Sequence, residues 1–317
     1  MLEKVIEWSL KNQVFVVIAL IFAILGGIWA VSEIRLDAIP DLSDVQVIIY
    51  TEYPGQAPQV VEDQVTYPIT SKMLSVPFAK VVRGYSFFGF SFTYVIFEDG
   101  TDLYWARSRV LEYLSGLANE LPDGVTPQLG PDATGVGWAF MYVLNSPDRP
   151  LDELRSLQDW YLRYGLMSVE GVSEVASLGG FVRQYQVEVD PVKLRAYDIP
   201  LSKIKRAIQR SNNDVGGRLI EAGEREMVVR GLGYIKEIRD LEQVPLGLGA
   251  GGNPVLLRDV ARINLGPEIR RGLAEWNGEG ETVGGIIVVR SGADTLETIA
   301  RVKDRLAELK DGLPDDV

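Results

Sequence analysis

Hydrophobic and polar positions divide the chain into one long apolar run and a much longer mixed region. The run extends from Val14 to Val31, and no charged residue occurs between Asn12 and Ser32. Eighteen residues of α-helix span roughly 27 Å, close to the ~30 Å hydrocarbon core of a bilayer. The pattern therefore predicts a transmembrane helix near the N-terminus.

A cleaved secretory signal is the alternative interpretation of this run. Lys4 and Lys11 would form its basic region, and Ala30-Val31-Ser32 would form its cleavage site. The apolar part of a signal is usually about 7–15 residues long, which is shorter than this run. The preceding segment, MLEKVIEWSLKNQ, also has the pattern of an interfacial amphipathic helix. We therefore expect a retained anchor.

Nearby positive charges predict how the anchor is oriented. Lys4 and Lys11 precede the run and Arg35 follows it, which favours a cytoplasmic N-terminus and places the chain after about residue 33 on the other side. Within the run, Ala19, Ala23 and Gly27 recur every four residues, so another helix can approach this small-residue stripe. Small residues are common in membrane helices, and the stripe alone identifies no partner.

The region after the anchor alternates between strand and helix patterns. Strands are predicted at 45–50, 76–85 and 90–97, helices at 58–74 and from Asp102 to about Glu120, and a closing strand from Val125. Pro68 lies inside the first of these helices and should kink or split it. The resulting β-α-β-β-α-β order is the split-βαβ or ferredoxin-like pattern.

A second unit repeats the first. A strand at 139–144, a helix at 151–167 and a strand at 172–177 follow the same order, and Ser168-Val169 matches Ser75-Val76 at an offset of 93. Further on, RVKDRLAELKDGLPDDV at 301–317 matches RVLEYLSGLANELPDGV at 109–125 at an offset of 192. The offsets differ by 99 residues, which predicts an insertion within the second unit. Because Val317 matches Val125, we interpret the sequence as the N-terminal piece of a longer protein.

The insertion has its own pattern of elements. It contains a strand at 185–189, a helix starting at Asp190-Pro191, a helix at 201–210, and strands around 227–229 and 255–257. A loop-rich arm is predicted at 211–218, since this stretch holds turn-forming residues. These are Asn212, Asn213, Asp214, Gly216 and Gly217.

Composition narrows the function. The net charge of −12 and the lack of an evident basic patch argue against nucleic acid as a partner. The chain has no Cys and no His, which removes thiolate chemistry, the commonest general base and the usual imidazole metal ligands. A cofactor-free acyl-transfer enzyme is therefore not expected, and we assign no catalytic or cofactor-binding residue.

Two motifs have a chemical and a structural interpretation. Gly247 to Gly252 matches the GxGxxG nucleotide fingerprint, but Pro254 and a strand-like segment follow it instead of a helix, which favours a hairpin loop. Glu98, Asp99 and Asp102 suit acid–base chemistry or a hard cation. Their place between a strand and a helix favours turn formation and N-capping.

Two further groups of side chains are expected to be structural. Four methionines are scattered without a close pair, so core packing is expected for each of them rather than binding of a soft metal. They are Met73, Met141, Met167 and Met227. Alternating Glu and Arg residues between 218 and 230 predict a solvated hairpin face.

A series of longer motifs spans nearly the whole chain. These are DLSDVQV at 41–47, YPGQAPQ at 53–59, QVTYP at 64–68, FEDGTD at 97–102, WARSRVLEY at 105–113, LGPDATGVGW at 129–138, LRDV at 257–260 and NGEGE at 277–281. Together they resemble the inner-membrane pumps of the resistance–nodulation–division (RND) superfamily, and most closely its heavy-metal efflux branch.

The resemblance implies an α+β fold with one N-terminal transmembrane helix and tandem ferredoxin-like porter subdomains, the second interrupted by an inserted α+β docking domain. Residues 1–36 would hold the interfacial segment and first transmembrane helix, 37–131 the first porter subdomain, 132–181 with 275–317 an incomplete second one, and 182–274 the docking insertion. The stretch 212–220 would resemble the hairpin that reaches into a neighbouring subunit.

The resemblance also implies a function. The protein would be a proton-driven exporter of heavy-metal cations and not an enzyme. It would form a homotrimer in the bacterial inner membrane, with a periplasmic adaptor and an outer-membrane channel. The family's proton-relay carboxylates and main metal-binding methionines lie in later segments, so no metal site is expected in this chain. Copper-type relatives tend to have Met near Ile269, which weakens copper or silver against zinc, cobalt or cadmium.

Three other functions remain open from the sequence. The first is a pump of the same architecture that exports organic molecules. The second is a non-transporting, membrane-anchored periplasmic scaffold, which needs only one span and two interaction domains. The third is an enzyme that uses the carboxylates near Glu98, for which Asp99→Ala would have to abolish an activity.

Overall fold

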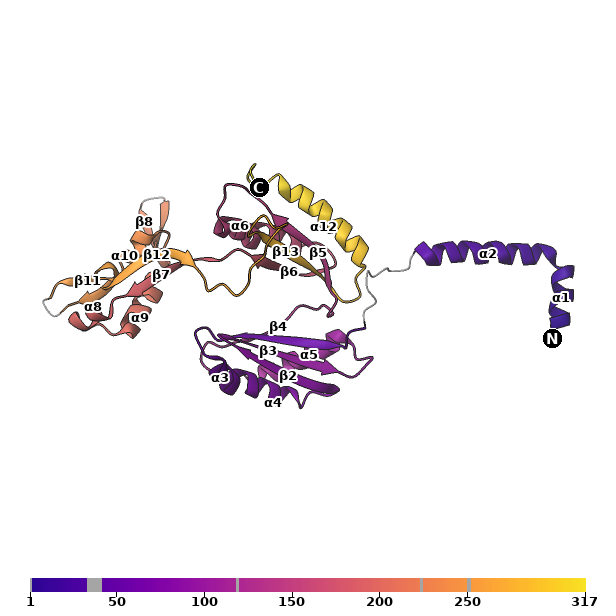
Figure 1. Ribbon diagram of the computed structural model, residues 1–317, viewed down its shortest axis with the longest axis horizontal. Helices are drawn as coiled ribbons and strands as arrows, with labels where there is room; N and C mark the ends of the chain where they lie inside the picture. Colours follow the sequence, from indigo (N-terminus) through magenta and orange to yellow (C-terminus); the bar gives the residue numbers. More distant parts are fainter. Residues whose placement is uncertain (1, 33–41, 118–119, 223–224, 250–251) are drawn as a thin grey trace. The chain divides into compact units, whose positions relative to one another are not determined.

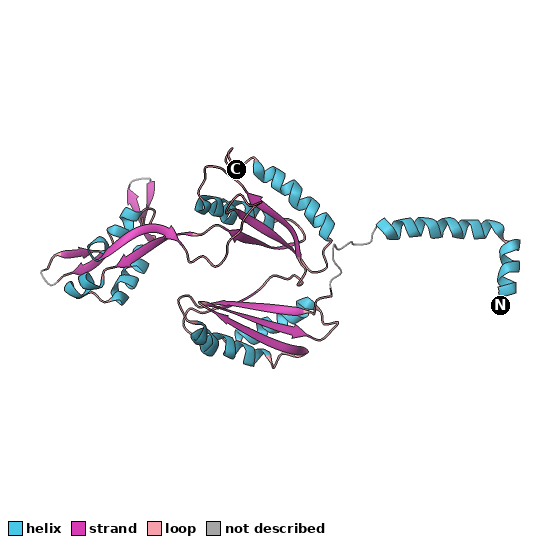
Figure 2. Cartoon of the chain, viewed as in Figure 1, coloured by secondary structure: helices cyan, strands magenta, loops and turns pink. Residues whose placement is uncertain are grey.

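The computed structural model describes residues 2–32, 42–117, 120–222, 225–249 and 252–317. Arg35 and the boundary expected at residue 36 lie outside the described residues. The fold is a mixture of helices and strands with one apolar N-terminal helix (Figure 1; Figure 2). Two compact units form: the first contains residues 1–144, 157–178 and 284–317, and the second contains residues 145–156 and 179–283.

Two consecutive helices begin the chain. α1 covers Leu2–Lys11 and α2 covers Gln13–Ser32. They meet at Asn12, whose side-chain amide and backbone N–H both donate to the Trp8 carbonyl at 3.0 Å. The Asn12 carbonyl in turn accepts the Val16 N–H at 3.2 Å, so helical backbone bonds continue through the junction and the side chain adds a second donor to Trp8.

The first sheet contains four antiparallel strands in the order β2-β3-β1-β4. These are β1 (Gln46–Glu52), β2 (Ala79–Phe87), β3 (Phe90–Phe97) and β4 (Pro127–Leu129). Helices α3 (Pro58–Val61), α4 (Tyr67–Met73) and α5 (Leu103–Ser115) lie on one face of this sheet (Figure 2). Val47 and Ile49 alternate with Ile48 and Tyr50 along β1, so only the first pair is buried in the core beneath the helices.

A π-helical turn, Glu62–Thr66, joins α3 to α4. Its last bond runs from the Tyr67 N–H to the Glu62 carbonyl, and Pro68 follows at the start of α4, where a missing N–H costs little. The predicted helix therefore contains a π-helical turn just before Pro68, but it is not split there, because Thr66 and Tyr67 keep a helical backbone. The buried Thr66 hydroxyl lies 2.8 Å from the hydroxyls of both Ser86 and Ser91, which ties the turn to the sheet.

The second sheet contains three strands in the order β5-β13-β6. They are β5 (Trp138–Leu144), β6 (Val172–Gly179) and β13 (Val283–Val289). Strands at matching positions of the two repeats occupy matching places, because β6-β13-β5 corresponds to β2-β3-β1. The edges also match: Val289 N–H donates to the Gly137 carbonyl at 2.8 Å, as Phe97 N–H donates to the Val45 carbonyl at 2.8 Å.

The helices of the second repeat match those of the first in two details. α6 (Leu151–Leu157) and α7 (Arg163–Met167) are joined by a π-helical turn, Gln158–Leu162. After β13, α12 (Thr295–Lys310) is N-capped by Asp294, as α5 is N-capped by Asp102. Buried Gln158 accepts the Tyr142 hydroxyl at 2.8 Å, and burial raises the pKa of Tyr142 to about 12.

The inserted part of the chain is built around an antiparallel pair of strands. β7 (Arg183–Val189) pairs with β12 (Ala261–Pro267) along its full length. The remaining elements are α8 (Pro191–Ala196), α9 (Leu201–Ser211), β8 (Val215–Ala222), β9 (Arg225–Gly231), α10 (Ile238–Glu242), β10 (Pro245–Leu248), β11 (Pro254–Leu256) and α11 (Leu257–Val260). Nine buried apolar residues from these elements form the core: Ile199, Ile204, Leu241, Val244, Leu246, Val255, Leu257, Val260 and Ile263.

Several predicted boundaries are wrong. The helix predicted to reach about Glu120 ends at Ser115, where Gly116 is its C-cap. The strand predicted from Val76 starts at Ala79, because the Val76 N–H donates to the Met73 carbonyl at 3.1 Å in a turn. The last strand of the first sheet starts at Pro127 rather than at Val125.

Candidate membrane segment and interaction arm

The apolar helix α2 has the composition and length of a membrane span. Residues 13–31 have a mean hydropathy of 2.9, and none of this stretch is buried inside the protein. A helix that is apolar on every side would expose apolar surface to water unless protein or lipid covers it, which favours lipid as the surroundings of α2. The predicted span is therefore a continuous helix, with Val14 and Val31 close to its ends.

Ala19, Ala23 and Gly27 form an exposed stripe along α2. A Cβ atom added to Gly27 would meet no atom within 4 Å. Among the described residues, nothing packs against this side of the helix. Packing of another helix against the stripe stays a prediction.

The arm is a β-hairpin formed by β8 and β9. Its register runs from Val215 opposite Gly231 to Ala222 opposite Arg225, with an irregularity between Gly216 and Leu219. Every residue of β9 is exposed. The hairpin also exposes an apolar series that a soluble surface rarely carries: Val215, Leu219, Ile220, Met227, Val228 and Val229.

The prediction of a loop over 211–218 is wrong. α9 continues to Ser211 and β8 begins at Val215, so Gly216 and Gly217 belong to a strand. The strand requires glycine at 217, because a Cβ atom there would lie 2.8 Å from the Val229 carbonyl oxygen. Glycines in a strand often mark such a close approach of two backbones. The solvated hairpin predicted from alternating charges is confirmed for Glu221, Arg225, Glu226 and Arg230, whereas Glu224 lies outside the described residues.

Asn212 and Asp214 hold the base of the arm. Asp214 Oδ1 accepts the backbone N–H groups of Gly233 at 2.8 Å and Tyr234 at 3.3 Å, and its Oδ2 accepts Arg230 Nε at 2.8 Å. Asn212 Oδ1 accepts the Ile235 N–H at 3.1 Å. These two side chains therefore connect the segment that enters the arm to the segment that leaves it.

The base of the arm favours a charged Asp214. The N–H of Gly233 and then the Arg230 side chain lower the pKa of its carboxyl group. Asn213 contributes through its backbone, because a Cβ atom on Gly233 would lie 2.3 Å from the Asn213 carbonyl oxygen. Sequence reasoning identified Asn212, Asn213 and Asp214 only as turn residues and Arg230 only as part of a solvated face, and it missed Gly233, which lies on the return side of the hairpin.

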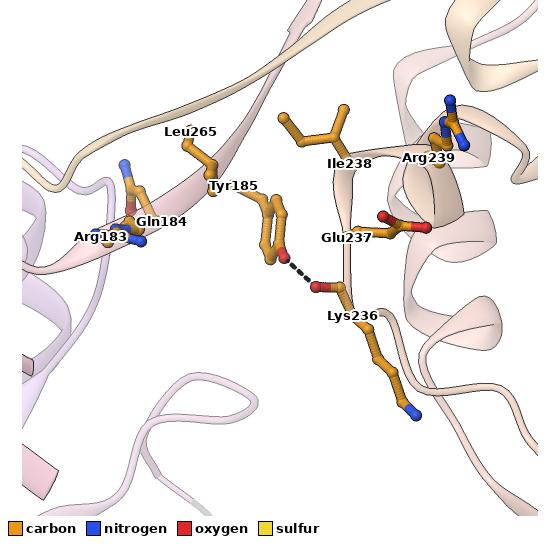
Figure 3. A pocket seen from close by; sticks show the side chains of 8 residues that line it. All are labelled: Arg183, Gln184, Tyr185, Lys236, Glu237, Ile238, Arg239 and Leu265. Carbon is orange, nitrogen blue, oxygen red and sulfur yellow. Dashed lines mark hydrogen bonds between the residues drawn. The ribbon is translucent and has the colours of Figure 1, made fainter.

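A cavity of about 480 Å³ lies near the end of the arm's return segment. Tyr185 on β7 donates its hydroxyl to the Lys236 carbonyl at 2.8 Å across it (Figure 3). The Lys236 amine and the Arg239 guanidinium point away from one another (Figure 3). Since its cationic groups do not converge, the cavity is not a built anion site.

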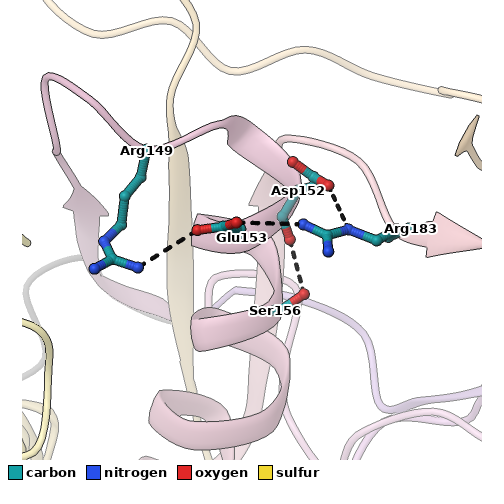
Figure 4. A network of polar contacts seen from close by, with 5 residues as sticks. All are labelled: Arg149, Asp152, Glu153, Ser156 and Arg183. Carbon is teal, nitrogen blue, oxygen red and sulfur yellow. Dashed lines mark hydrogen bonds and ion pairs between the residues drawn. The ribbon is translucent and has the colours of Figure 1, made fainter. Parts of the chain in front are cut away.

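Arg183 at the start of β7 joins a network of ion pairs (Figure 4). Its Nε lies 2.5 Å from Asp152 Oδ2 and its Nη2 lies 3.6 Å from Glu153 Oε1. Arg149 reaches the same Glu153 at 3.4 Å from the other side. The hydrogen bond and charge of Asp152 raise the pKa of Arg183. The network fixes the start of β7 rather than presenting a free charge.

The two motifs with a possible chemical role have structural roles. Gly247 and Leu248 of the glycine run lie in β10, which pairs antiparallel with β11, as a hairpin requires, whereas Ala250 and Gly251 lie outside the described residues. Asp102 Oδ1 accepts the Trp105 N–H at 2.7 Å, which confirms N-capping for that residue. Within the described ranges, no three His, Cys, Asp or Glu side chains are grouped to hold a metal ion.

The prediction that every methionine packs in the core is wrong for three of four. Met73 is fully buried, but the side chains of Met141, Met167 and Met227 are 58%, 45% and 52% exposed. Met141 lies on β5, which is an edge strand of the second sheet, and Met227 lies on β9, where every residue is exposed. Ile269 is also exposed, at 67%.

Comparison with known proteins gives the context of this architecture. Residues 5–317 match the sequence profile of the AcrB/AcrD/AcrF family. The chain is 54% identical to the putative cation efflux system protein SilA of Salmonella typhimurium and 53% identical to the cation efflux system protein CusA of Escherichia coli K12. Each alignment covers 100% of this chain and 30% of the relative, so the chain spans less than a third of their length.

A crystal structure of a heavy metal efflux pump shares the fold. It superposes with a TM-score of 0.82 at 35% sequence identity. The superposition covers 95% of this chain and 30% of that pump.

Proposed function

Because the chain belongs to the AcrB/AcrD/AcrF family, we propose that it is the N-terminal part of a heavy-metal cation efflux pump of the RND superfamily. The observation that carries this proposal is similarity over the whole chain to proteins named for cation efflux. Such a protein moves ions across a membrane and is a transporter rather than an enzyme. Proton influx would drive the export of the metal cation.

The proposed layout follows from the repeated sheets. Residues 37–131 form the first porter subdomain, residues 132–181 and 275–317 form most of the second, and residues 182–274 form the docking insertion. The matching strand orders of the first and second sheets support a duplicated porter unit. The separate core of the inserted part supports a docking domain with its own stability.

In the proposed arrangement α2 is the first membrane helix and lies in the lipid of the bacterial inner membrane. The N-terminus is cytoplasmic and the chain after about residue 33 is periplasmic. Since these 317 residues lack cysteine, single cysteines at Ser9 and Ser43, in a protein with any cysteine elsewhere replaced, test this topology in whole cells. A membrane-impermeant maleimide should label Ser43→Cys and leave Ser9→Cys unlabelled. The reverse pattern would contradict the orientation.

The arm would hold the pump together as a homotrimer. Its exposed apolar side chains and its braced base suit insertion into a neighbouring subunit. Replacing Leu219, Ile220 and Val228 by serine should shift the full-length protein from trimer to monomer in native mass spectrometry. A matched change at the exposed polar residue Glu226, Glu226→Gln, should leave the trimer intact. A periplasmic adaptor and an outer-membrane channel would complete the export route.

A tolerance assay tests the transport function. The full-length gene, expressed in a host without its own metal pumps, should raise tolerance to at least one of copper, silver, zinc, cobalt and cadmium. Unchanged tolerance to all five, with the protein present in the membrane, would exclude metal export. If the arm variant still raises metal tolerance, metal export does not depend on the proposed trimer contact.

An organic substrate is the second candidate. A cavity of about 460 Å³ on the open face of the first sheet favours it, since aromatic side chains line the cavity, among them Tyr85, Phe87, Phe92 and Tyr94. Tolerance to dyes or detergents without tolerance to metals would select this candidate. If the gene raises tolerance neither to metals nor to dyes and detergents, the membrane-anchored scaffold is the remaining candidate.

A further inference from the structure

The segment between the first and second sheets, residues 130–137, is anchored at both ends. Gly130 N–H donates to the Ile48 carbonyl of β1 at 2.7 Å, and the Gly137 carbonyl accepts the Val289 N–H of β13 at 2.8 Å. Both glycines permit a close approach, because an added Cβ atom would lie 3.1 Å from Ile48 Cβ or 3.2 Å from the Val289 oxygen. We call residues 130–137 the linker segment.

The Asp132 carboxylate accepts hydrogen bonds and an ion pair from residues of both repeats. Tyr104 on α5 donates its hydroxyl to Oδ2 at 2.9 Å. Ser173 on β6 donates its hydroxyl to Oδ1, and Arg290 Nε, just after β13, lies 3.0 Å from Oδ2. The Asp132 side chain is only 16% exposed, so three partners from three elements meet at one mostly buried carboxylate.

Two arginines add contacts to the backbone around this carboxylate. Arg107 on α5 donates from Nη1 to the carbonyls of Gly130 at 2.8 Å and Pro131 at 3.2 Å. Arg290 donates from Nη2 to the Val172 carbonyl at 3.3 Å. The Ser291 N–H then reaches the Asp132 carbonyl at 2.9 Å. One arginine therefore comes from each repeat.

We propose that Asp132 is a clamp that couples α5 of the first repeat to β6 and β13 of the second. Without the clamp, a segment with three glycines, Gly130, Gly135 and Gly137, would behave as a flexible joint. Hydrogen bonds to an ionised acceptor are roughly twice as strong as neutral ones. One carboxylate with three donors therefore limits bending of the linker segment. This role is independent of the transport function.

Spin-label distances in the 317-residue chain, purified in detergent, test the clamp. Because the chain lacks cysteine, nitroxides can be placed at Leu111→Cys on α5 and Leu296→Cys on α12, whose side chains are 56% and 54% exposed. Asp132→Ala should broaden the distance distribution at least twofold. Asp304→Ala, at an exposed aspartate of α12, should leave its width unchanged.

Two outcomes would overturn the clamp. One is an unchanged width in Asp132→Ala with native circular dichroism, and the other is equal broadening in Asp304→Ala. If Asp132→Ala does not fold, Tyr104→Phe and Ser173→Ala each remove one hydroxyl donor with little change in shape. Each should broaden the distribution less than twofold and the pair should broaden it further, whereas no broadening from either would reject the proposal. A second label pair within one repeat, at Leu74 and Leu111, should keep its width in every variant.

Discussion

Arg290 Nε lies 3.0 Å from Asp132 Oδ2, although the whole inserted part of the chain separates the two residues in sequence. The pair connects the linker segment to the first residue after β13, where the chain has returned from the insertion. The ion pair therefore joins the segment after the first repeat to the segment after the last strand of the second sheet.

Protonation of Asp132 should weaken this connection. Burial alone would raise its pKa, but the hydrogen bonds of Ser173 and Tyr104 and the charge of Arg290 outweigh burial and lower the pKa. A carboxylate with a lowered pKa stabilises the folded state above its unfolded pKa of about 3.9, and this contribution is lost as the pH falls through the folded value. The stability lost in Asp132→Asn should therefore be greatest at neutral pH and should shrink below about pH 4. Urea midpoints of both proteins at pH 7, 5 and 3 measure it, and a difference that does not vary with pH would contradict the assignment.

Gly84 should not tolerate a side chain. It lies on β2 beneath the π-helical turn, where an added Cβ atom would lie 2.4 Å from Thr66 Cγ2 and 2.8 Å from Thr70 Cγ2. Gly84→Ala should cost about 1–3 kcal/mol by overpacking. Gly116→Ala is the control, since its nearest contact would be 3.5 Å away. Thermal unfolding of both variants checks the prediction, which equal melting temperatures would refute.

The two capping aspartates should contribute similar amounts to the free energy of unfolding. Asp102 accepts the Trp105 N–H at 2.7 Å, and Asp294 accepts the Glu297 N–H at 2.8 Å. Each change to alanine should cost about 0.5–2 kcal/mol, because one backbone donor of the first turn loses its partner. Chemical unfolding of Asp102→Ala and Asp294→Ala measures these costs. Asp304→Ala, in the interior of α12, should cost less than either.

Loss of Asp214 should loosen the base of the arm. Asp214→Ala leaves the N–H groups of Gly233 and Tyr234 without their acceptor. A local loss of about 1.4 kcal/mol corresponds to about tenfold faster exchange of these amide hydrogens. Hydrogen-exchange mass spectrometry of peptides from this segment measures it. Glu226→Ala on β9 is the matched control, and equal acceleration in both would assign the effect to charge alone.

The elements predicted best from the sequence are those whose own pattern of apolar residues decides their structure. β3 occupies Phe90–Phe97, as predicted, because aromatic and β-branched residues alternate there between core and open face. The N-terminal helix is also as predicted, since a run without charge has few other stable conformations. The Asp102 cap followed from one local rule, an acceptor side chain before the first turn.

Predictions failed where contacts distant in sequence decide the structure. Gly216 and Gly217 have the composition of a turn, but their pairing with β9 makes them part of a strand. The partners of Asp132 lie on α5, β6 and after β13, and no local pattern connects them. The methionine prediction rested on residue type alone, whereas the pairing of the strands places Met141 on the edge strand β5 and Met227 on the exposed hairpin strand β9.

The π-helical turn at Glu62–Thr66 also decides how this gene can change in length. Such a turn contains one residue more than an α-helical turn, so removal of a single codon there would restore a regular helix. Val61, Val65, Ile69 and Met73 are all fully buried. Without Asp63, the last three would follow Val61 by three, seven and eleven residues, and at about 100° per residue all four would still lie on one face of the helix. Deletion of Asp63 should therefore leave the protein folded, whereas insertion of a further residue into the turn should move Ile69 and Met73 away from the face that carries Val61.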